Sequence, residues 1–324
     1  MQALTLLWNP TDGIDLGFFK IQFYSLMFVV AFSLGWYIIK KIYKKEQESE
    51  KNLDSLFIYM VLAILIGARI GHVLFYQSEL VFQDPLSIIL PFRFVPEIEY
   101  TGFRGLASHG AAIAVIVAMY YYSKNIIKKP MLWILDRVVI PVASGAIFVR
   151  IGNFINSEII GKEVTDFPLG VQFLKDSIGE RQATLITKIK DPNKAYDAIA
   201  NNPEFAEILA SIPFRHPAQL YESFGYIFVF LTLLYFYWKT DKSKQLGFLF
   251  GLFLVLLWTV RFFVEFVKEA QVDTRGDWLL NTGQWLSIPF VLCGVILWFN
   301  PTKKHTTANP YLRLYTYFRS YNFI

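Results

Sequence analysis

The sequence has little charge and almost no cysteine. Only 18% of its 324 residues are charged, against about 25% in an average soluble domain, and 54% are apolar. The single cysteine, Cys293, lies in an apolar stretch, which excludes a disulfide framework and a thiolate zinc site within one chain. The net charge is a modest +5, and the lysines stand in short runs beside apolar segments, so we expect no nucleic-acid partner. This composition predicts a membrane protein.

Seven apolar stretches approach the ~20 residues that a helix needs to cross the hydrocarbon core. The first is followed by lysines and has no small-residue cleavage site, so we expect it to remain as the first helix. The predicted fold class is an all-α polytopic membrane protein. Its seven transmembrane helices are expected at Ile21–Ile39, Leu56–Tyr76, Gly105–Ser123, Met131–Phe154, Pro217–Trp238, Leu246–Val267 and Gln284–Phe299.

Basic residues in the connections orient these helices. Counted alternately along the chain, fifteen Lys and Arg fall on one side and five on the other. Because cytoplasmic loops carry the excess of basic residues, we expect the N-terminus outside and the C-terminus in the cytoplasm.

The domain organisation that we predict is one integral membrane domain over residues 1–324. Residues 157–215 mix both charge signs with several prolines and are expected to form an extracytoplasmic head between helices 4 and 5. Within the head, the segment Gly179–Ala210 favours a pair of short amphipathic helices over strands. The basic, aromatic residues 300–324 are expected to form a cytoplasmic tail on the inner membrane surface.

Polar side chains inside the predicted helices gather at one depth. An unpaired arginine at the centre of a membrane helix costs about 2.5–3.5 kcal/mol, so several such residues indicate a function. With the predicted orientation, six helices bring polar residues into the outer half of the membrane: Tyr24, Arg69, His109, Arg150, His216, Gln219, Tyr221, Glu222 and Arg261.

Spacings of three or four residues place these side chains on shared helix faces. Three acidic residues, Glu158, Glu222 and Glu265, can pair with part of the positive charge. An anionic lipid or peptide can satisfy the rest, since the planar arginine fork donates two hydrogen bonds to one phosphate. The sets that share a face are Arg150–Asn153–Asn156, Gln219–Glu222 and Arg261–Glu265.

Ordinary structural roles compete with these assignments. Arg69 alone fits a side chain that anchors its helix at the membrane surface, and His109 alone fits a satisfied core histidine. Arg137 stands beside Asp136 and is expected to form a local pair. The pairs Gly67–Gly71 and Gly247–Gly251 have the spacing that lets helices approach closely.

One motif is long enough to identify a family. Residues 150–158 read Arg-Ile-Gly-Asn-Phe-Ile-Asn-Ser-Glu and are followed by Gly161. They resemble the signature of bacterial prolipoprotein diacylglyceryl transferases. Further matches follow in the same order over nearly the whole chain, at residues 23–27, 67–76, 108–110, 215–222, 261–266 and 283–289.

The resemblance implies seven transmembrane helices with the N-terminus outside, in the bacterial cytoplasmic (inner) membrane. It implies transfer of a diacylglyceryl group from phosphatidylglycerol to the lipobox cysteine thiol of a prolipoprotein signal peptide, with glycerol 1-phosphate as the by-product. The expected partners are therefore phosphatidylglycerol, prolipoprotein signal peptides and membrane lipid. We expect no cofactor and no metal, since the carboxylates and histidines lack ligand spacing.

The resemblance also implies which residues act. It makes His109, Arg150 and Arg261 catalytic, and its other functional positions fall on Tyr24, Asn153, Glu158 and Gly161. With the polar residues found above, the expected substrate-binding set becomes Tyr24, Arg69, Asn153, Asn156, Glu158, Gly161, His216, Gln219, Glu222 and Glu265. For this reaction, the arginines would stabilise the phosphate that leaves, and neutral His109 would accept the thiol proton.

Three positions depart from the family pattern: Ala111 and Ser157 stand where glycine is usual, and Leu257 where some members have tyrosine. A transporter or channel with an intramembrane Arg/His path is the alternative function. The absence of an inverted repeat and of polar residues in the inner half weighs against it. A structural anchor for a peptide-binding head would leave the polar cluster unexplained.

Overall fold

The computed structural model describes residues 6–17, 20–88, 90, 92–94, 97–100, 105, 107–165, 167–269 and 279–303. Most of the predicted cytoplasmic tail, residues 304–324, lies outside the described residues. The chain forms two compact units. Unit 2 spans Asp12–Gly152, and unit 1 combines the segment up to Thr11 with the chain from Asn153 onward.

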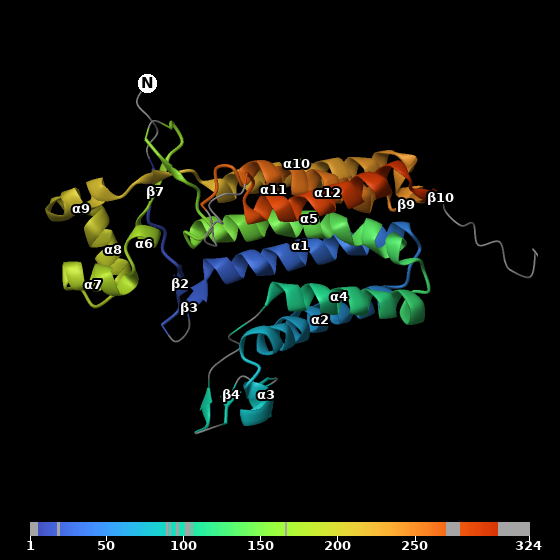
Figure 1. Cartoon of the computed structure of the whole chain (residues 1–324), viewed down its shortest axis with the longest axis horizontal. Helices are drawn as coiled ribbons and strands as arrows, with labels where there is room; N and C mark the ends of the chain where they lie inside the picture. The colour runs from blue at the N-terminus through green and yellow to red at the C-terminus, as the bar shows by residue number, and fades with distance from the viewer. Residues whose placement is uncertain are drawn as a thin grey trace, which may run out of the picture. The chain divides into compact units, whose positions relative to one another are not determined.

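Unit 2 is built on long helices, and Figure 1 shows α2 and α4 running side by side within it. The helix α5 begins in unit 2, and its last three residues belong to unit 1. A π-helical turn, η2, extends α4. The elements are β2 (Gly13–Asp15), β3 (Lys20–Gln22), α1 (Phe23–Lys45), α2 (Glu50–Tyr76), α3 (Leu80–Gln83), η1 (Pro85–Ile88), β4 (Phe92–Arg93), β5 (Glu99–Tyr100), α4 (Ser108–Tyr121), η2 (Tyr122–Ile126) and α5 (Met131–Ile155).

Small residues let α2 and α4 pack closely. A Cβ atom built on Gly71 would lie 2.5 Å from the Cα of Gly110, and one built on Gly67 would lie 2.8 Å from the Gly110 carbonyl oxygen. Contacts this short exclude any side chain at these positions. The close approach predicted from Gly67 and Gly71 is therefore confirmed, and it serves packing inside unit 2.

Unit 1 contains three long helices and a four-stranded sheet that joins the N-terminal strand to residues 157–215. In Figure 1, α10 to α12 lie together in orange and red. The sheet has the order β1-β7-β8-β6, in which β1 pairs with β7 in parallel and the other pairs are antiparallel. The elements are β1 (Leu6–Trp8), β6 (Glu163–Val164), β7 (Val171–Phe173), α6 (Leu174–Ser177), α7 (Glu180–Thr187), α8 (Pro192–Asn201), η3 (Pro203–Phe205), α9 (Ala206–Ser211), β8 (Phe214–Arg215), α10 (Ala218–Lys239), η4 (Asp241–Lys244), β9 (Gln245–Leu246), α11 (Phe248–Val264), α12 (Thr282–Phe299) and β10 (Thr302–Lys303).

The head has a small apolar core. Its helical segment follows the expected pattern, since Asp191 caps α8 by accepting hydrogen bonds from the backbone of Asn193 and Lys194, and Pro192 opens the helix. The helical prediction for Gly179–Ala210 is confirmed, but its count was wrong because α9 follows α7 and α8. The buried core residues are Leu174, Ile178, Ala183, Ala195, Tyr196, Ile199 and Ile212.

The long helices are apolar enough for a membrane. Among the described residues, α1, α2, α5, α10 and α12 have the length and composition to cross one, while α11 is apolar with 17 residues and α4 has 14. Large apolar side chains on these helices are open, as for Leu65 at 55% and Val117 at 63% exposure. The chain is thus a predominantly helical, polytopic membrane protein. All seven predicted segments contain a helix, but the all-α description was incomplete because it missed the four-stranded sheet of unit 1.

Candidate functional site

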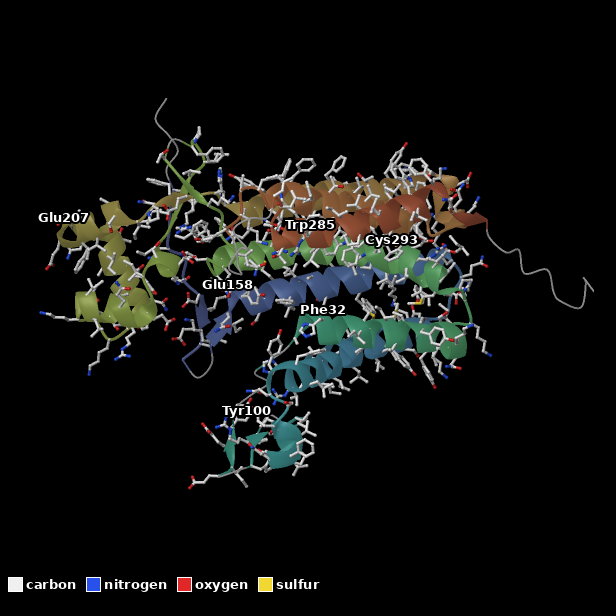
Figure 2. The ribbon with its side chains drawn as sticks, in the orientation of Figure 1. Phe32, Tyr100, Glu158, Glu207, Trp285 and Cys293 are labelled. Carbon is white, nitrogen blue, oxygen red and sulfur yellow. The ribbon has the colours of Figure 1, made fainter. Side chains whose placement is uncertain are left out.

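The end of α5 forms a hydrogen-bonded turn, which we call the signature turn (residues 153–158). Asn153 and Asn156 donate from their Nδ2 atoms to the two carboxylate oxygens of Glu158, at 3.3 and 3.2 Å. The Glu158 backbone N–H donates to the Asn153 carbonyl oxygen at 2.9 Å. Figure 2 labels Glu158 beside the end of α5. Three residues singled out from the sequence therefore meet in one turn.

The backbone of the signature turn explains one departure from the family pattern. Ser157 has φ +56°, in the left-handed region that glycine adopts with least strain. Ile159 follows with φ +59°, although its branched side chain disfavours this region. The usual glycine thus has a backbone reason at position 157, and serine accepts the same conformation with some strain.

The first turn of α10 contacts the signature turn. Gln219 donates from Nε2 to the Glu158 carbonyl oxygen at 2.6 Å. Gln219 and Glu222 are 0% and 1% exposed, and their spacing of three residues places them on one face of α10. A buried amide and a buried carboxylate are therefore fixed beside the turn, which is unusual for an apolar helix.

Gly161 and His216 meet through their backbones. The Gly161 N–H donates to the His216 carbonyl oxygen at 2.9 Å, and a Cβ atom on Gly161 would lie only 2.5 Å from that oxygen. The His216 ring makes other contacts: its Nδ1 atom lies 3.2 Å from the Tyr221 hydroxyl, and the ring forms a T-shaped pair with Phe167. Burial lowers the pKa of the His216 imidazole below its ordinary value.

Arg261 shares a carboxylate with a lysine that follows it. Its Nε atom lies 3.9 Å from Glu265 Oε1, and the buried Lys268 donates from Nζ to the same oxygen at 2.8 Å. Asn281, the N-cap of α12, donates to the Glu265 carbonyl oxygen and to Oε2, at 3.0 and 3.4 Å. Among the described residues, Arg261 Nε is buried and makes no hydrogen bond. Glu265 is thus bound by several donors, and its pair with Arg261 is loose.

Trp258 lies beside Arg261 on α11. The Arg261 guanidinium is 5.4 Å from the Trp258 ring centroid, a cation–π distance, and the ring stacks on Phe290 at 4.1 Å. Trp258 follows Leu257, the position at which the family sometimes has tyrosine. An aromatic contact with the arginine is therefore present one residue further along the helix.

The segment after α11 joins Arg261 to the signature. Lys268 and Gly161 form an antiparallel bridge, and the Lys162 N–H donates to the Val267 carbonyl oxygen at 2.8 Å. Arg215 forms ion pairs with Glu163 at 3.0 Å and Glu269 at 3.1 Å. Unit 1 thus fixes the signature, the start of α10 and the end of α11 to one another.

Unit 2 carries the candidate base. His109 is the second residue of α4, and the centroid of its exposed ring lies 4.7 Å from that of Phe75, in a T-shaped contact, and 6.0 Å from that of Tyr76. Within the described part of the chain, no hydrogen bond to the ring is found. The next residue, Gly110, is held tightly by α2, so the backbone that presents His109 is well supported.

Three other candidates belong to unit 2: Arg69 and Tyr24, which have structural contacts, and Arg150 on α5. Arg69 donates from Nε to the Ile88 carbonyl oxygen at 3.1 Å and from Nη2 to the Ser87 carbonyl oxygen at 2.7 Å, which ties η1 to α2. Tyr24 packs on α5, where a Cβ atom on Gly152 would lie 2.9 Å from its ring. Arg150, half-buried, precedes Asn153 by three residues on the same helix.

Arg137 forms the local pair expected from the sequence. Its Nη1 atom lies 3.9 Å from Asp136, and its Nη2 atom donates to Glu46 at 2.8 Å. Within the described residues, no group of three or more His, Cys, Asp or Glu side chains is placed to hold a metal ion.

Sequence reasoning missed Lys268, Asn281 and Trp8. Lys268 had a usable signal, since it follows Glu265 by three residues, the spacing of a local ion pair. Trp8 had none, because its indole N–H donates to the Phe154 carbonyl oxygen across 146 residues of sequence.

Known proteins resemble the chain over almost all of its length. The model of a family described as prolipoprotein diacylglyceryl transferase matches residues 13–300. The chain is 35% identical over 300 residues to the phosphatidylglycerol–prolipoprotein diacylglyceryl transferase of Tolumonas auensis, covering 92% of this chain and 98% of that protein. Proteins of the same name from Bacteroides fragilis and Chloroherpeton thalassium are 34% and 33% identical, over 93% and 92% of this chain and 97% and 95% of their own lengths.

Proposed function

The chain belongs to the prolipoprotein diacylglyceryl transferase family, and on this premise we propose that it transfers diacylglyceryl from phosphatidylglycerol to a prolipoprotein. The lipobox cysteine sulfur attacks the glyceryl carbon that carries the phosphate. A carbon–sulfur bond forms and the carbon–oxygen bond breaks, so the electron pair leaves with glycerol 1-phosphate. The products are a thioether-linked diacylglyceryl cysteine, glycerol 1-phosphate and one proton. The observation that carries this proposal is the identity of a third or more to transferases of that name over nearly the whole chain.

Arg150 and Arg261 bind the phosphate and stabilise the charge that it gains as the carbon–oxygen bond breaks. Donors that the protein has already oriented stabilise negative charge strongly in a site with little water, because the low dielectric constant strengthens the attraction. The loose pair of Arg261 with Glu265, at 3.9 Å, supports this role because the guanidinium keeps donors for a substrate.

The signature turn and the start of α10 bind the head group. Asn153 and Asn156, which each donate to Glu158, offer amide groups to the head group, and the carboxylates of Glu158 and the buried Glu222 accept from glycerol hydroxyls. Gln219 holds the turn through the Glu158 carbonyl oxygen. The remaining candidates, Tyr24, Arg69, Gly161, His216 and Glu265, act by shaping the backbone and side chains around these groups.

His109 accepts the proton of the cysteine thiol. A free thiol has a pKa near 8.5 and reacts as the thiolate, so a neutral imidazole is a suitable acceptor. The exposed ring at the start of α4 supports this role, since a peptide has access to it.

The proposed setting is the bacterial inner membrane, crossed by seven helices with the N-terminus outside. Residues 157–215 then form an extracytoplasmic head and residues 300–324 a cytoplasmic tail. A labelling experiment tests this arrangement: after Cys293→Ser, single cysteines in the head and near Lys242 are exposed to a membrane-impermeant maleimide on intact cells. Labelling of the second position, or protection of the first, contradicts the orientation.

The function is tested with the purified protein, phosphatidylglycerol carrying labelled acyl chains and a lipobox peptide. We expect label on the peptide, and none on a matched peptide with serine in place of the lipobox cysteine. His109→Asn and Arg150→Ala are each expected to abolish transfer while the protein stays folded and inserted, and near-normal turnover by either contradicts its role. Anion or proton flux through liposomes without transfer would instead support a channel.

A further inference from the structure

The N-terminal strand reaches the signature turn. Trp8, the last residue of β1, donates its indole N–H to the Phe154 carbonyl oxygen at 2.8 Å, and its ring lies 4.2 Å from the Phe154 ring. The parallel pairing of β1 with β7 aligns Trp8 with Phe173, which is fully buried. An N-terminal segment that is tied into a sheet in this way is ordered. The half-buried indole is therefore held at the end of α5 by its contacts with Phe154 and by the pairing of β1 with β7.

The carbonyl that Trp8 contacts lies inside the signature turn. The last carbonyl groups of a helix lack intrahelical partners, and their acceptors are satisfied from outside. The Phe154 oxygen accepts from the Ser157 N–H at 3.1 Å and from Trp8. Its neighbour, the Asn153 oxygen, accepts from the Glu158 N–H at 2.9 Å. Trp8 thus restrains the peptide group from which the turn begins.

The turn needs such restraint because its backbone is strained. Ser157 and Ile159 both have positive φ angles, +56° and +59°, which non-glycine residues keep only when their surroundings enforce them. Two side chains from distant parts of unit 1 donate to carbonyls of this segment: Gln219 to Glu158 and Trp8 to Phe154. Gln219 was recognised from the sequence as a site residue, whereas Trp8, which makes the same kind of contact, was not.

We propose that Trp8 is a positioning residue for the lipid substrate: its indole N–H holds the signature turn in the conformation in which Asn153, Asn156 and Glu158 meet. This inference rests on the proposed function, which assigns these three residues to the head group. Trp8 itself touches no substrate. Its effect therefore passes through the turn and falls on the lipid, and the peptide is unaffected.

The first experiment separates the hydrogen bond from the ring contact. Trp8→Phe keeps an aromatic ring against Phe154 and removes the N–H. We expect the KM for phosphatidylglycerol to rise about tenfold, the change that corresponds to losing one well-formed hydrogen bond, while the Phe154 oxygen keeps its bond from the Ser157 N–H. The KM for the lipobox peptide is expected to stay within about twofold. Trp36→Phe is the matched control, because Trp36 is 39% exposed on α1, and we expect it to leave both KM values unchanged.

A second experiment tests whether the effect passes through the signature turn. In an Asn156→Ala background, where the Asn156–Glu158 bond is already lost, Trp8→Phe is expected to raise the KM for phosphatidylglycerol less than about threefold. Residues that act as one unit give such non-additive changes, whereas general destabilisation gives the same factor in both backgrounds. An equal factor in both backgrounds overturns the proposal.

If the phenylalanine variant does not fold, Trp8 is replaced by benzothienylalanine, which keeps the bicyclic ring and has sulfur in place of the N–H. The KM values for phosphatidylglycerol and for the peptide are then measured with that variant. A folded Trp8 variant whose KM for phosphatidylglycerol stays within twofold of the wild type overturns the inference. So does a peptide KM that rises as much as the lipid KM. Absence of transfer by the wild-type protein is a different result, since it removes the proposed function and leaves Trp8 a structural contact.

Discussion

Replacement of Gly161 by alanine tests whether this position is required for steric reasons. A Cβ atom there would lie 2.5 Å from the His216 Cβ and carbonyl oxygen and 2.8 Å from the Val267 carbonyl oxygen, where ordinary contacts are 3.4–4 Å. To reach 3.4 Å, the His216 side must therefore move by about 0.9 Å and the Val267 side by about 0.6 Å. The movement acts on three backbone hydrogen bonds: Gly161 to His216, His216 to Lys162, and Lys162 to Val267, at 2.9, 3.1 and 2.8 Å.

The expected size of the effect follows from these contacts. Overpacking costs about 1–3 kcal/mol, and each of the three weakened backbone bonds about 1 kcal/mol, so the total is about 4–6 kcal/mol. For a protein of this size the thermal midpoint then falls by roughly 5 °C or more. The same movement pulls the Gly161 strand away from Lys268 and the segment after Arg261, so we also expect a large loss of transfer activity.

The assay is thermal unfolding of the detergent-solubilised protein together with transfer to a lipobox peptide. Gly179→Ala is the matched control, because nothing lies within 4 Å of a Cβ atom there and φ is −66°. Alanine is a poorer N-cap than glycine, which lowers the free energy of unfolding, but it also restricts the unfolded chain, which raises it. The net change in the free energy of unfolding should therefore stay below about 1 kcal/mol. If Gly161→Ala matched Gly179→Ala in both midpoint and activity, the steric reasoning would be refuted.

Three further variants test the charges of the site. Arg261→Lys should lower kcat/KM for phosphatidylglycerol about tenfold or more, because an ammonium cannot donate as a fork; full activity would mean that charge alone suffices. Lys268→Met should destabilise the protein by about 3 kcal/mol, since Lys268 and Glu265 are buried partners at 2.8 Å, and adding Glu265→Gln should recover much of that loss in thermal unfolding. Additive losses would contradict this coupling. For His216 the folded pKa is lowered, so the unfolded state binds the proton more tightly and stability should fall as pH drops below about 6.5. His216→Asn should flatten that dependence of the midpoint, and an unchanged slope would contradict it.

Much of the fold was predictable because long apolar stretches report a lipid environment. All seven predicted segments contain a helix, and Met131–Phe154 agrees with α5 (Met131–Ile155) to within one residue. The short strands were not predictable. β6 has two residues and β1 three, too few for a period to show, and their partners are distant in sequence.

The candidate site was predictable by residue and less so by contact. Spacing and the family signature selected Asn153, Asn156 and Glu158, which share hydrogen bonds in the structure. Spacing did not reveal that the arginine fork of Arg69 donates to the carbonyl groups of η1. A sequence pattern indicates that a charged side chain lies in an apolar helix. Which group pairs with that side chain depends on the backbone carbonyls that the fold leaves without other hydrogen bonds.

The amino-acid sequence by itself determined that the chain is a helical membrane protein of this transferase family, because hydropathy and motif identity are local properties of the chain. Only the tertiary structure decided how Trp8 meets Phe154 and how Lys268 and Asn281 share the Glu265 carboxylate. Such contacts join residues whose separation in sequence carries no periodic signal. They form only when packing of the helices and the head brings donors to acceptors that would otherwise be buried without a partner.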